Sequence, residues 1–359
     1  MIFRKRAAPF TFPMPQQRLH KYKRDLENLP PREITERSLE IVALIERYRF
    51  LPTSLIVKLS PGHEKHTARH LQALYHKELV NRFAFPRVGN PGEFIYYLDR
   101  TQALELLVDG GTTRDEVDWD LVKRNYVKDY AAINLGKNID DLQGRLMHLQ
   151  HELMISRFHA MLELACRKSA GRVELHQFKQ GSELWHTVEV PVMRFSGEGW
   201  IESDKTERLP HRPDAFFTLR YPNESGDKEF AHFFYEADRK HTSTKKHNRK
   251  LRAHFHYVVK QRRHEEDYGI KRVRAVLIET TDMYWADELR EAAKHVLVSG
   301  NKPSPLFWFT TSQLFCEPRG VEDGTTARKL PLYLTKPEIV FKKVWASPAE
   351  DKLISLLDQ

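Results

Sequence analysis

The chain has 359 residues, and 58 lysines and arginines against 49 aspartates and glutamates give it a formal net charge of +9. This length favours two domains rather than one core, and a basic balance is typical of proteins with a polyanionic partner such as double-stranded DNA. Two cysteines and the absence of any run of about 18 apolar residues argue against a disulfide framework, a cysteine zinc site and a membrane partner. We therefore expect a cytoplasmic protein.

Residues 1–33 interleave basic side chains with several prolines, which disfavours a long helix and predicts a basic, largely extended arm. Residues 34–110 then carry the pattern of three helices and two strands. Apolar residues recur at helical spacing from Thr35, a Pro-Thr-Ser cap begins a second helix, and a third is expected over His63–Leu79. Two strands around a Gly-Asn-Pro-Gly turn follow. This order is typical of a winged helix-turn-helix domain.

In a winged helix the third helix enters the major groove and the hairpin touches the flanking backbone. The expected DNA contacts are Lys65, His66, Arg69 and His70 on the helix, with Arg82 and Arg87 on the wing. The alternative is that these residues form the solvated side of a protein-interaction module.

A polar segment over residues 111–140 predicts helical links. Residues 141–320 then follow the order helix, three strands, basic helix, strand, helix, strand. This order predicts a mixed sheet flanked by helices and an α/β (α+β) fold overall. Residues 321–359 remain as a C-terminal extension.

Three carboxylates come from two adjacent predicted strands. Asp214 begins one strand, whereas Glu236 and Asp238 end the next, where residues two apart share a face. Such oxygen ligands suit Mg²⁺ or Mn²⁺, which can activate water and offset charge on a scissile phosphate. The spacing leaves open that Asp214 caps a turn while the other two acids pair with nearby cations.

The chain becomes basic directly after these acids, with no carboxylate between residues 239 and 263. An acidic cluster with a basic flank indicates a nucleic-acid substrate. The residues expected to hold DNA phosphates there are Arg239, Lys245, Lys246 and Arg249.

The motif Arg212-Pro213-Asp214, followed by an apolar strand ending in Glu236-Ala237-Asp238, resembles the PD-(D/E)XK nuclease superfamily. With the winged helix before it and Lys250-Leu251 after it, the chain over residues 34–310 resembles the plasmid replication-relaxation family. That family is linked to plasmid replication and to relaxases of the mobilisation-C type. The resemblance implies a restriction-endonuclease-like sheet, metal-dependent nicking of duplex DNA, and other replication or mobilisation proteins as partners.

One position departs from the superfamily pattern, because Asp238 stands where a lysine usually assists the attack on phosphorus. Lys240, if the strand continues, and Lys250 on the following helix are the candidate replacements, and the Lys-Leu pattern favours Lys250. The competing interpretation is a nuclease fold without chemistry, in a DNA-binding regulator or replication accessory protein. Glu152, beside His151 on the preceding helix, is a supplementary acidic candidate, although a solvated helix residue is the simpler interpretation.

His254-Phe255-His256 matches a histidine pair that holds a metal in another class of relaxase. That arrangement needs a strand, whereas this motif lies in a predicted helix, where residues two apart diverge. We therefore expect no shared metal between His254 and His256.

Overall fold

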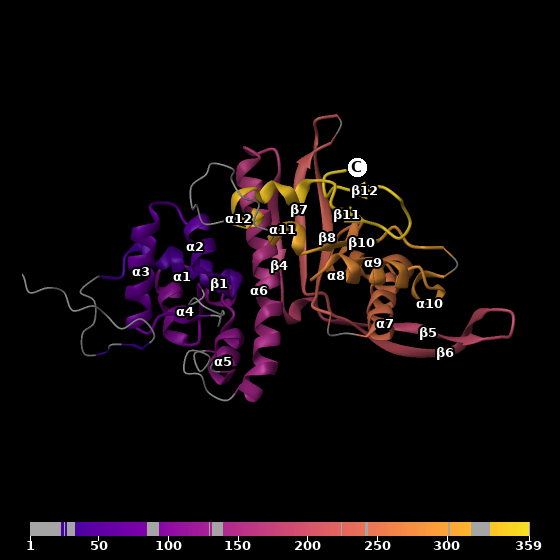
Figure 1. The fold of residues 1–359 in the computed structure, drawn as a ribbon, viewed down its shortest axis with the longest axis horizontal. Coiled ribbons are helices and arrows are strands. Elements are labelled where there is room, and N and C mark those ends of the chain that lie inside the picture. Colours follow the sequence, from indigo (N-terminus) through magenta and orange to yellow (C-terminus); the bar gives the residue numbers. More distant parts are fainter. Residues whose placement is uncertain are drawn as a thin grey trace, which may run out of the picture.

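The structure is a computed structural model that describes residues 23–24, 26, 33–84, 93–128, 130, 139–223, 225–240, 243–300, 302–316 and 331–358. Within these residues it has a mixed α/β architecture, as the sequence predicts. A small N-terminal module lies on one side of a long helix, and a large sheet lies on the other (Figure 1). No helix in these ranges has both the length and the apolar character needed to cross a membrane.

The N-terminal module packs helices against a three-stranded antiparallel sheet with the order β1-β3-β2. Its elements are α1 (Glu36–Tyr48), β1 (Leu51–Pro52), α2 (Thr53–Leu59), α3 (Glu64–His76), β2 (Asn81–Ala84), β3 (Phe94–Tyr97) and α4 (Thr101–Asp109). The apolar faces of α1, α2 and α3 meet in one buried core that includes Ile41, Leu55 and Leu71. The module therefore has the three helices and two strands expected from the sequence, with a third helix that ends three residues earlier and an additional short strand, β1, that was not predicted.

The long helix α6 (Ile139–Lys168) belongs to both halves of the molecule. It follows η1 (Arg114–Glu116) and α5 (Trp119–Lys128). Ala160 is part of the N-terminal core, whereas Phe158 is part of the core beneath the large sheet. The Ser156 hydroxyl also donates to the Tyr48 carbonyl at 2.6 Å. One helix thus fixes the two halves to each other.

The large sheet has seven strands in the order β12-β11-β10-β9-β8-β7-β4. They are β4 (Glu174–Lys179), β7 (Ala215–Pro222), β8 (Lys228–Asp238), β9 (Ala275–Thr280), β10 (Phe307–Thr311), β11 (Trp345–Ala346) and β12 (Leu353–Ile354). Strands β8, β9 and β10 run parallel, whereas β4, β7 and β8 pair antiparallel. The parallel strands end at one edge of the sheet, where their following loops converge.

Alternate side chains of these strands are buried on opposite faces, as the two-residue period of a strand requires. Phe217 and Tyr235 pack on the face covered by α6, whereas Phe216 and Phe234 pack on the opposite face. The opposite face is covered by α7 (Thr244–Phe255), its π-helical continuation η4 (His256–Lys260), α8 (Arg263–Tyr268), α9 (Met283–Ala292) and α10 (Val296–Ser299). The result is three layers, with helices on both faces of the sheet.

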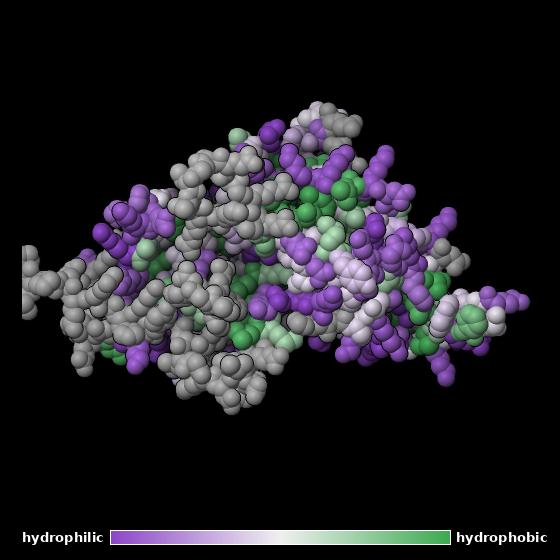
Figure 2. All heavy atoms as spheres, viewed as in Figure 1, coloured by the Kyte–Doolittle hydropathy of each residue, from purple (hydrophilic) through white to green (hydrophobic). Residues whose placement is uncertain are grey.

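A two-stranded antiparallel hairpin of β5 (His186–Phe195) and β6 (Trp200–His211) interrupts the sheet order between β4 and β7, after the short η3 (Ser182–Leu184). The hairpin was not predicted from the sequence. The hairpin projects from the body (Figure 1), and most of its side chains are exposed. Phe195 and Trp200 of this hairpin are exposed. Figure 2 shows some hydrophobic side chains at the surface on this side of the molecule.

The described part of the C-terminal extension completes the sheet. It contains α12 (Leu332–Thr335), η5 (Pro337–Phe341) and strands β11 and β12, and it follows α11 (Gln313–Cys316). Trp345 is fully buried against Phe158 of α6, with ring centroids 6.3 Å apart. This segment therefore packs as part of the large core.

Candidate active site

The pairing of β7 with β8 brings the two conspicuous acidic motifs together. Ala215 lies opposite Tyr235 in the antiparallel register, and the Asp214 N–H donates to the Tyr235 carbonyl at 3.1 Å. The Ala237 N–H in turn donates to Asp214 Oδ2 at 2.8 Å. The Asp214 carboxylate is therefore fixed beside the end of β8, between Glu236 and Asp238.

Asp214 is held from the α6 side by a histidine. His151 Nε2 lies 3.2 Å from Asp214 Oδ2. Burial alone would lower the pKa of His151, but the Asp214 carboxylate raises that pKa to about 10. Burial alone would likewise raise the pKa of Asp214, but the His151 and Lys250 cations keep it well below its usual range. The two groups therefore form an ion pair at neutral pH.

Glu236 points towards α7, where Lys250 interacts with both Glu236 and Asp214. The Lys250 ammonium contacts Glu236 Oε2, and His254 Nε2 lies 2.6 Å from Oε1. Burial raises the pKa of Glu236, and the nearby Lys250 cation only partly offsets this rise. Burial alone would lower the pKa of Lys250, but the neighbouring Glu236 and Asp214 carboxylates raise it. Lys250 and Glu236 form an ion pair, because a cation touches one carboxylate oxygen and a ring nitrogen hydrogen-bonds to the other.

Asp238 ends the strand on the same face as Glu236. Its Oδ1 accepts a hydrogen bond from Trp285 Nε1 and another from the Lys240 backbone N–H, both at 2.8 Å. His247 Nδ1 lies 3.9 Å from Oδ2, and burial lowers the pKa of His247 to about 4. His247 is therefore neutral at pH 7 and contributes no positive charge to Asp238.

A small cavity of about 10 Å³, enough for one water molecule, opens between Glu236, Asp238, His247, Lys250 and His254. The Lys250 ammonium borders this cavity. It interacts electrostatically with Asp214 and Asp238 as well as with Glu236. In the described part of the chain, no three His, Cys, Asp or Glu side chains converge in a metal-ligand arrangement. The carboxylate oxygens of Glu236 and Asp238 are donors of the kind that Mg²⁺ and Mn²⁺ prefer, although Lys250 already pairs with Glu236.

The two lysines that could replace the missing superfamily lysine lie in different surroundings. Lys250 contacts Glu236, whereas Lys240 Nζ lies 3.8 Å from Asp282 and 5.6 Å from the Trp285 ring centroid. Lys240 also adopts a left-handed backbone conformation with φ of 61°, which ends the strand at Asp238. Lys240 would share the face of Glu236 only if the strand continued to it. Because β8 ends at Asp238, it does not.

The basic residues expected to hold phosphates differ in their availability. Lys245 and Lys246 are exposed on the first turn of α7. Arg249 is exposed but bonds to Glu207 of β6 at 2.9 Å. Arg239 is half-buried and donates to Gln150 Oε1 on α6 at 2.5 Å.

On the N-terminal module, Lys65, His66 and Arg69 are exposed on α3, as expected. His70 is not, because it is buried and its Nδ1 lies 3.0 Å from the Ser38 hydroxyl of α1. That expectation of exposure was wrong: His70 lies on the inner face of the amphipathic helix.

The structure also contradicts the expected exposure of Arg82. Its guanidinium is buried between the rings of Tyr75 and Phe94, 4.0 and 4.4 Å from their centroids. In this position the Arg82 side chain is not exposed to a phosphate at the surface. Arg87, the other wing residue, lies outside the described residues.

Sequence reasoning missed the residues that hold the acids in place. His151 and Trp285 approach from α6 and α9, and their sequence positions carry no motif. A signal did exist on α7, where His247, Lys250 and His254 recur three and four residues apart and face β8 together.

Two further expectations concern histidines and an acid near the cluster. His254 contacts Glu236, whereas His256 lies among Arg252 and Lys260, which together with burial lower its pKa to about 4. The two imidazoles diverge as expected of helical residues two apart. Glu152 is not a solvated residue, because it is largely buried and lies 3.9 Å from Arg49.

Comparison with protein-family models matches residues 42–273, well over half of the chain, to a family described as replication-relaxation. The match begins within α1 and includes α2, α3 and both acidic motifs. Neither the curated proteins nor the solved structures contain a match to this chain.

Proposed function

The chain belongs to the replication-relaxation family, and on that premise we propose that it binds duplex DNA and nicks one strand at Asp214, Glu236 and Asp238 with Mg²⁺ or Mn²⁺. The N-terminal module is a winged helix in this proposal, and the sheet is a nuclease core of the PD-(D/E)XK type. Its role lies in plasmid or mobile-element replication and DNA relaxation.

The observation that carries the proposal is the contact between Lys250 and Glu236 beside Asp214. A nuclease site of this type needs two acids on adjacent strands and a lysine that reaches the same point. Here the lysine comes from the helix after the strand rather than from the strand itself. Asp238 therefore replaces the usual lysine in sequence without removing an ammonium group from the site.

Asp214 and Glu236 would hold the divalent cation, with Asp238 as a third oxygen donor. A cation bound there supplies an acidified water and offsets charge on the phosphate. The Lys250 ammonium then moves from the carboxylate to a non-bridging phosphate oxygen, and His254 keeps Glu236 oriented through its hydrogen bond. His151 holds Asp214 ionised and in place.

The DNA path of the proposal uses the exposed cations. Lys65, His66 and Arg69 of α3 contact the duplex, and Lys245 and Lys246 of α7 hold phosphates close to Lys250. Lys246 and Lys250 are four residues apart, so they lie on one side of the helix. A phosphate backbone bound at Lys246 therefore lies one helical turn from the carboxylates.

The test uses a supercoiled plasmid that carries the DNA flanking the coding sequence, with Mg²⁺, Mn²⁺ or EDTA. Asp214→Asn and Glu236→Gln should abolish metal-dependent conversion to open circles and retain duplex binding, measured by fluorescence anisotropy. Asp204→Asn, on the exposed hairpin, is the matched control and should nick like wild type. Calorimetric titration with Mn²⁺ gives a readout that does not depend on cleavage, and Asp214→Asn should weaken it.

A second function is favoured by the saturation of Glu236, whose two oxygens are both engaged by Lys250 and His254. In this alternative the protein is a non-catalytic DNA-binding regulator or replication accessory protein, and the ion pairs only stabilise the fold. Intact plasmid at every metal concentration and no Mn²⁺ binding, in a wild-type protein that still binds the duplex, would support it against nicking.

A further inference from the structure

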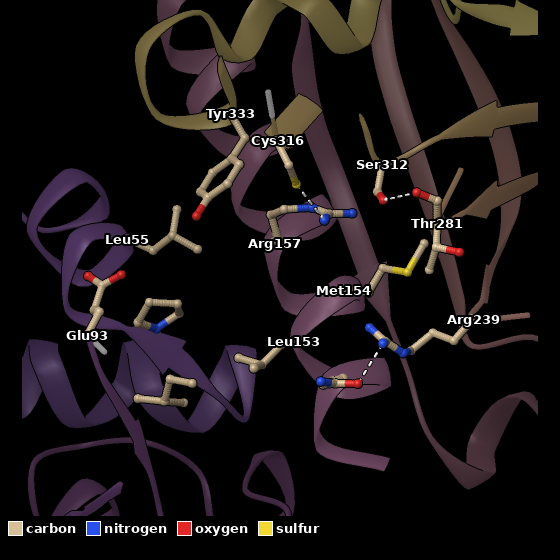
Figure 3. A pocket seen from close by; sticks show the side chains of 13 residues that line it. Leu55, Glu93, Leu153, Met154, Arg157, Arg239, Thr281, Ser312, Cys316 and Tyr333 are labelled. Carbon is tan, nitrogen blue, oxygen red and sulfur yellow. Dashed lines mark hydrogen bonds between the residues drawn. The ribbon is translucent and has the colours of Figure 1, made fainter. Parts of the chain in front are cut away.

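A cavity of about 410 Å³ lies between the N-terminal module and the edge of the large sheet. Leu55 comes from the module, Leu153 and Arg157 from α6, and Arg239 and Thr281 from the ends of β8 and β9, as Figure 3 shows. Its volume falls within the range of small-ligand sites. Neither the proposed chemistry nor the packing of the two halves requires this space.

Among the described charged residues that line the cavity, Arg239 is the cation that no carboxylate neutralises. Arg157 is neutralised by the buried Glu279, and the Glu93 carboxylate accepts hydrogen bonds from Ser54 at the start of α2. In contrast, no carboxylate of the described residues pairs with Arg239, whose Nε is buried without a hydrogen-bond partner there. Burial and the neighbouring Arg157 both lower the pKa of Arg239, so a bound anion would relieve this repulsion.

The remaining walls are apolar, with an aromatic ring at one border. Leu55, Leu153 and Met154 provide flat hydrocarbon surface, and Tyr333 of α12 borders the same space (Figure 3). Gln150 and Ser312 add an amide and a hydroxyl. A planar heterocycle carrying a phosphate matches this combination, because its ring packs against apolar and aromatic groups and its phosphate pairs with a guanidinium.

The cavity adjoins the carboxylate cluster through two pairs of consecutive residues. Arg239 follows Asp238, and Gln150, which binds Arg239, precedes His151, which holds Asp214. A phosphate on Arg239 therefore lies next to the sheet edge at which strand cleavage is proposed.

We propose that this cavity receives one nucleotide unstacked from the DNA strand, with its phosphate on Arg239 and its base between Leu153 and Tyr333. The inference rests on the proposed function, since it takes DNA as the substrate. A nucleotide withdrawn from the stack holds the strand still, and its neighbouring phosphodiester then lies at Glu236 and Lys250.

The test compares two labelled duplexes by fluorescence anisotropy with the full chain, one fully paired and one with a single-nucleotide bulge. Wild type should bind the bulged duplex about tenfold more tightly, the size of one base-stacking contact. Leu153→Trp fills the cavity and should remove this preference while paired-duplex affinity is kept. Leu353→Trp, at an exposed position of β12, is the matched control and should keep it.

Arg239→Gln tests the phosphate contact without altering the packing of the cavity and should also remove the preference. Circular dichroism melting confirms that each variant is folded. Equal wild-type affinity for the two duplexes overturns the inference and leaves the proposed DNA binding intact, whereas no binding to either overturns the proposed function itself. Equal affinity combined with calorimetric binding of deoxyadenosine monophosphate would assign the cavity to a free nucleotide, which also overturns the strand-bound occupant.

Discussion

Each acid of the cluster is held by a different element. His151 of α6 binds Asp214, Lys250 of α7 binds Glu236, and Trp285 of α9 binds Asp238. Carboxylates this close would repel one another without such partners. The helices on the two faces of the sheet therefore do more than cover it, because they fix the orientation and charge of the residues at its edge.

Replacement of Lys250 by methionine keeps the aliphatic stem and removes the charge. Glu236 then loses its cation while buried, which should lower the free energy of unfolding by about 1 kcal/mol, near the bottom of the usual range because Lys250 is partly exposed. Lys246→Met, an exposed position one turn earlier, should change it by less than about 0.5 kcal/mol. Urea unfolding measures both.

The double variant Lys250→Met with Glu236→Gln completes the cycle. Its loss of stability should be smaller than the sum of the two single losses, since the neutral amide no longer needs a cation. Simple additivity of the two changes would show that Lys250 and Glu236 are not coupled.

The ion pair of His151 with Asp214 predicts a specific pH dependence. A raised histidine pKa contributes stability that is complete below about pH 6.5 and is lost as the pH rises through about 10. The unfolding free energy of wild type should therefore decline between pH 7 and 10 relative to His151→Gln. His176→Gln, at an exposed position of β4, should decline in parallel with wild type. A constant difference between wild type and His151→Gln across this range would contradict the assignment.

At the residue scale, candidate site residues could be identified from the sequence only where they belong to a motif. Asp214, Glu236 and Lys250 were singled out from their spacing and the Lys-Leu pattern, which are local features, and the structure brings them close together. His151 and Trp285 could not be predicted as partners of the acids, because their contacts depend on how α6 and α9 pack on the sheet edge. Arg82 was misjudged for a related reason, since a cation next to two aromatic rings prefers their faces to solvent.

At the scale of elements, a helix or strand could be predicted where its apolar residues recur with a clear period. Helix α3 lies within the range predicted for it, His63–Leu79, because its apolar residues recur at helical spacing. The β5–β6 hairpin was missed because its inward residues are few, among them Val188, Val190 and Leu209. The short strands β11 and β12 have two residues each, which is too short for any alternation to show.

Helix α3 gives a prediction for DNA binding. Lys65→Ala with Arg69→Ala should weaken duplex affinity and reduce the slope of log affinity against log salt by about 2, one unit per phosphate contact. Lys58→Ala on the neighbouring α2 is the control and should leave the slope unchanged. An unaltered slope in the double variant would exclude α3 as the DNA contact.

Arg82 should behave in the opposite way to these cations. Arg82→Ala removes a buried guanidinium from between two rings and should lower the unfolding free energy by about 1–2 kcal/mol. The salt slope of DNA binding should not change. A reduced slope at full stability would instead restore Arg82 as a phosphate contact.

The C-terminal strands give a prediction for stability. Trp345→Ala should destabilise the protein by about 3–5 kcal/mol in urea unfolding, because the ring is fully buried in the core under the large sheet. The same substitution at Trp200, which is partly exposed near the hairpin tip, should cost less than about 0.5 kcal/mol. Similar effects at the two positions would show that the C-terminal segment is not part of the core.

At the scale of the whole molecule, the two halves share more than a connection. Residues of α6 belong to the module core and to the sheet core, and Leu334 of α12 packs with the module as well. The Arg167 guanidinium of α6 adds a hydrogen bond to the Leu59 carbonyl at 2.6 Å. Interfaces of this kind do not allow the halves to turn freely against each other.

The shared helix has a geometric consequence for the proposed nicking. With 30 residues, α6 is about 45 Å long, and it keeps α3 at a constant separation from the carboxylates. On a duplex held by α3, the cut then falls at a set number of base pairs from the bound sequence, whatever bases lie between. The protein would thus measure its target as a ruler does, and its specificity would reside in a distance as much as in a sequence.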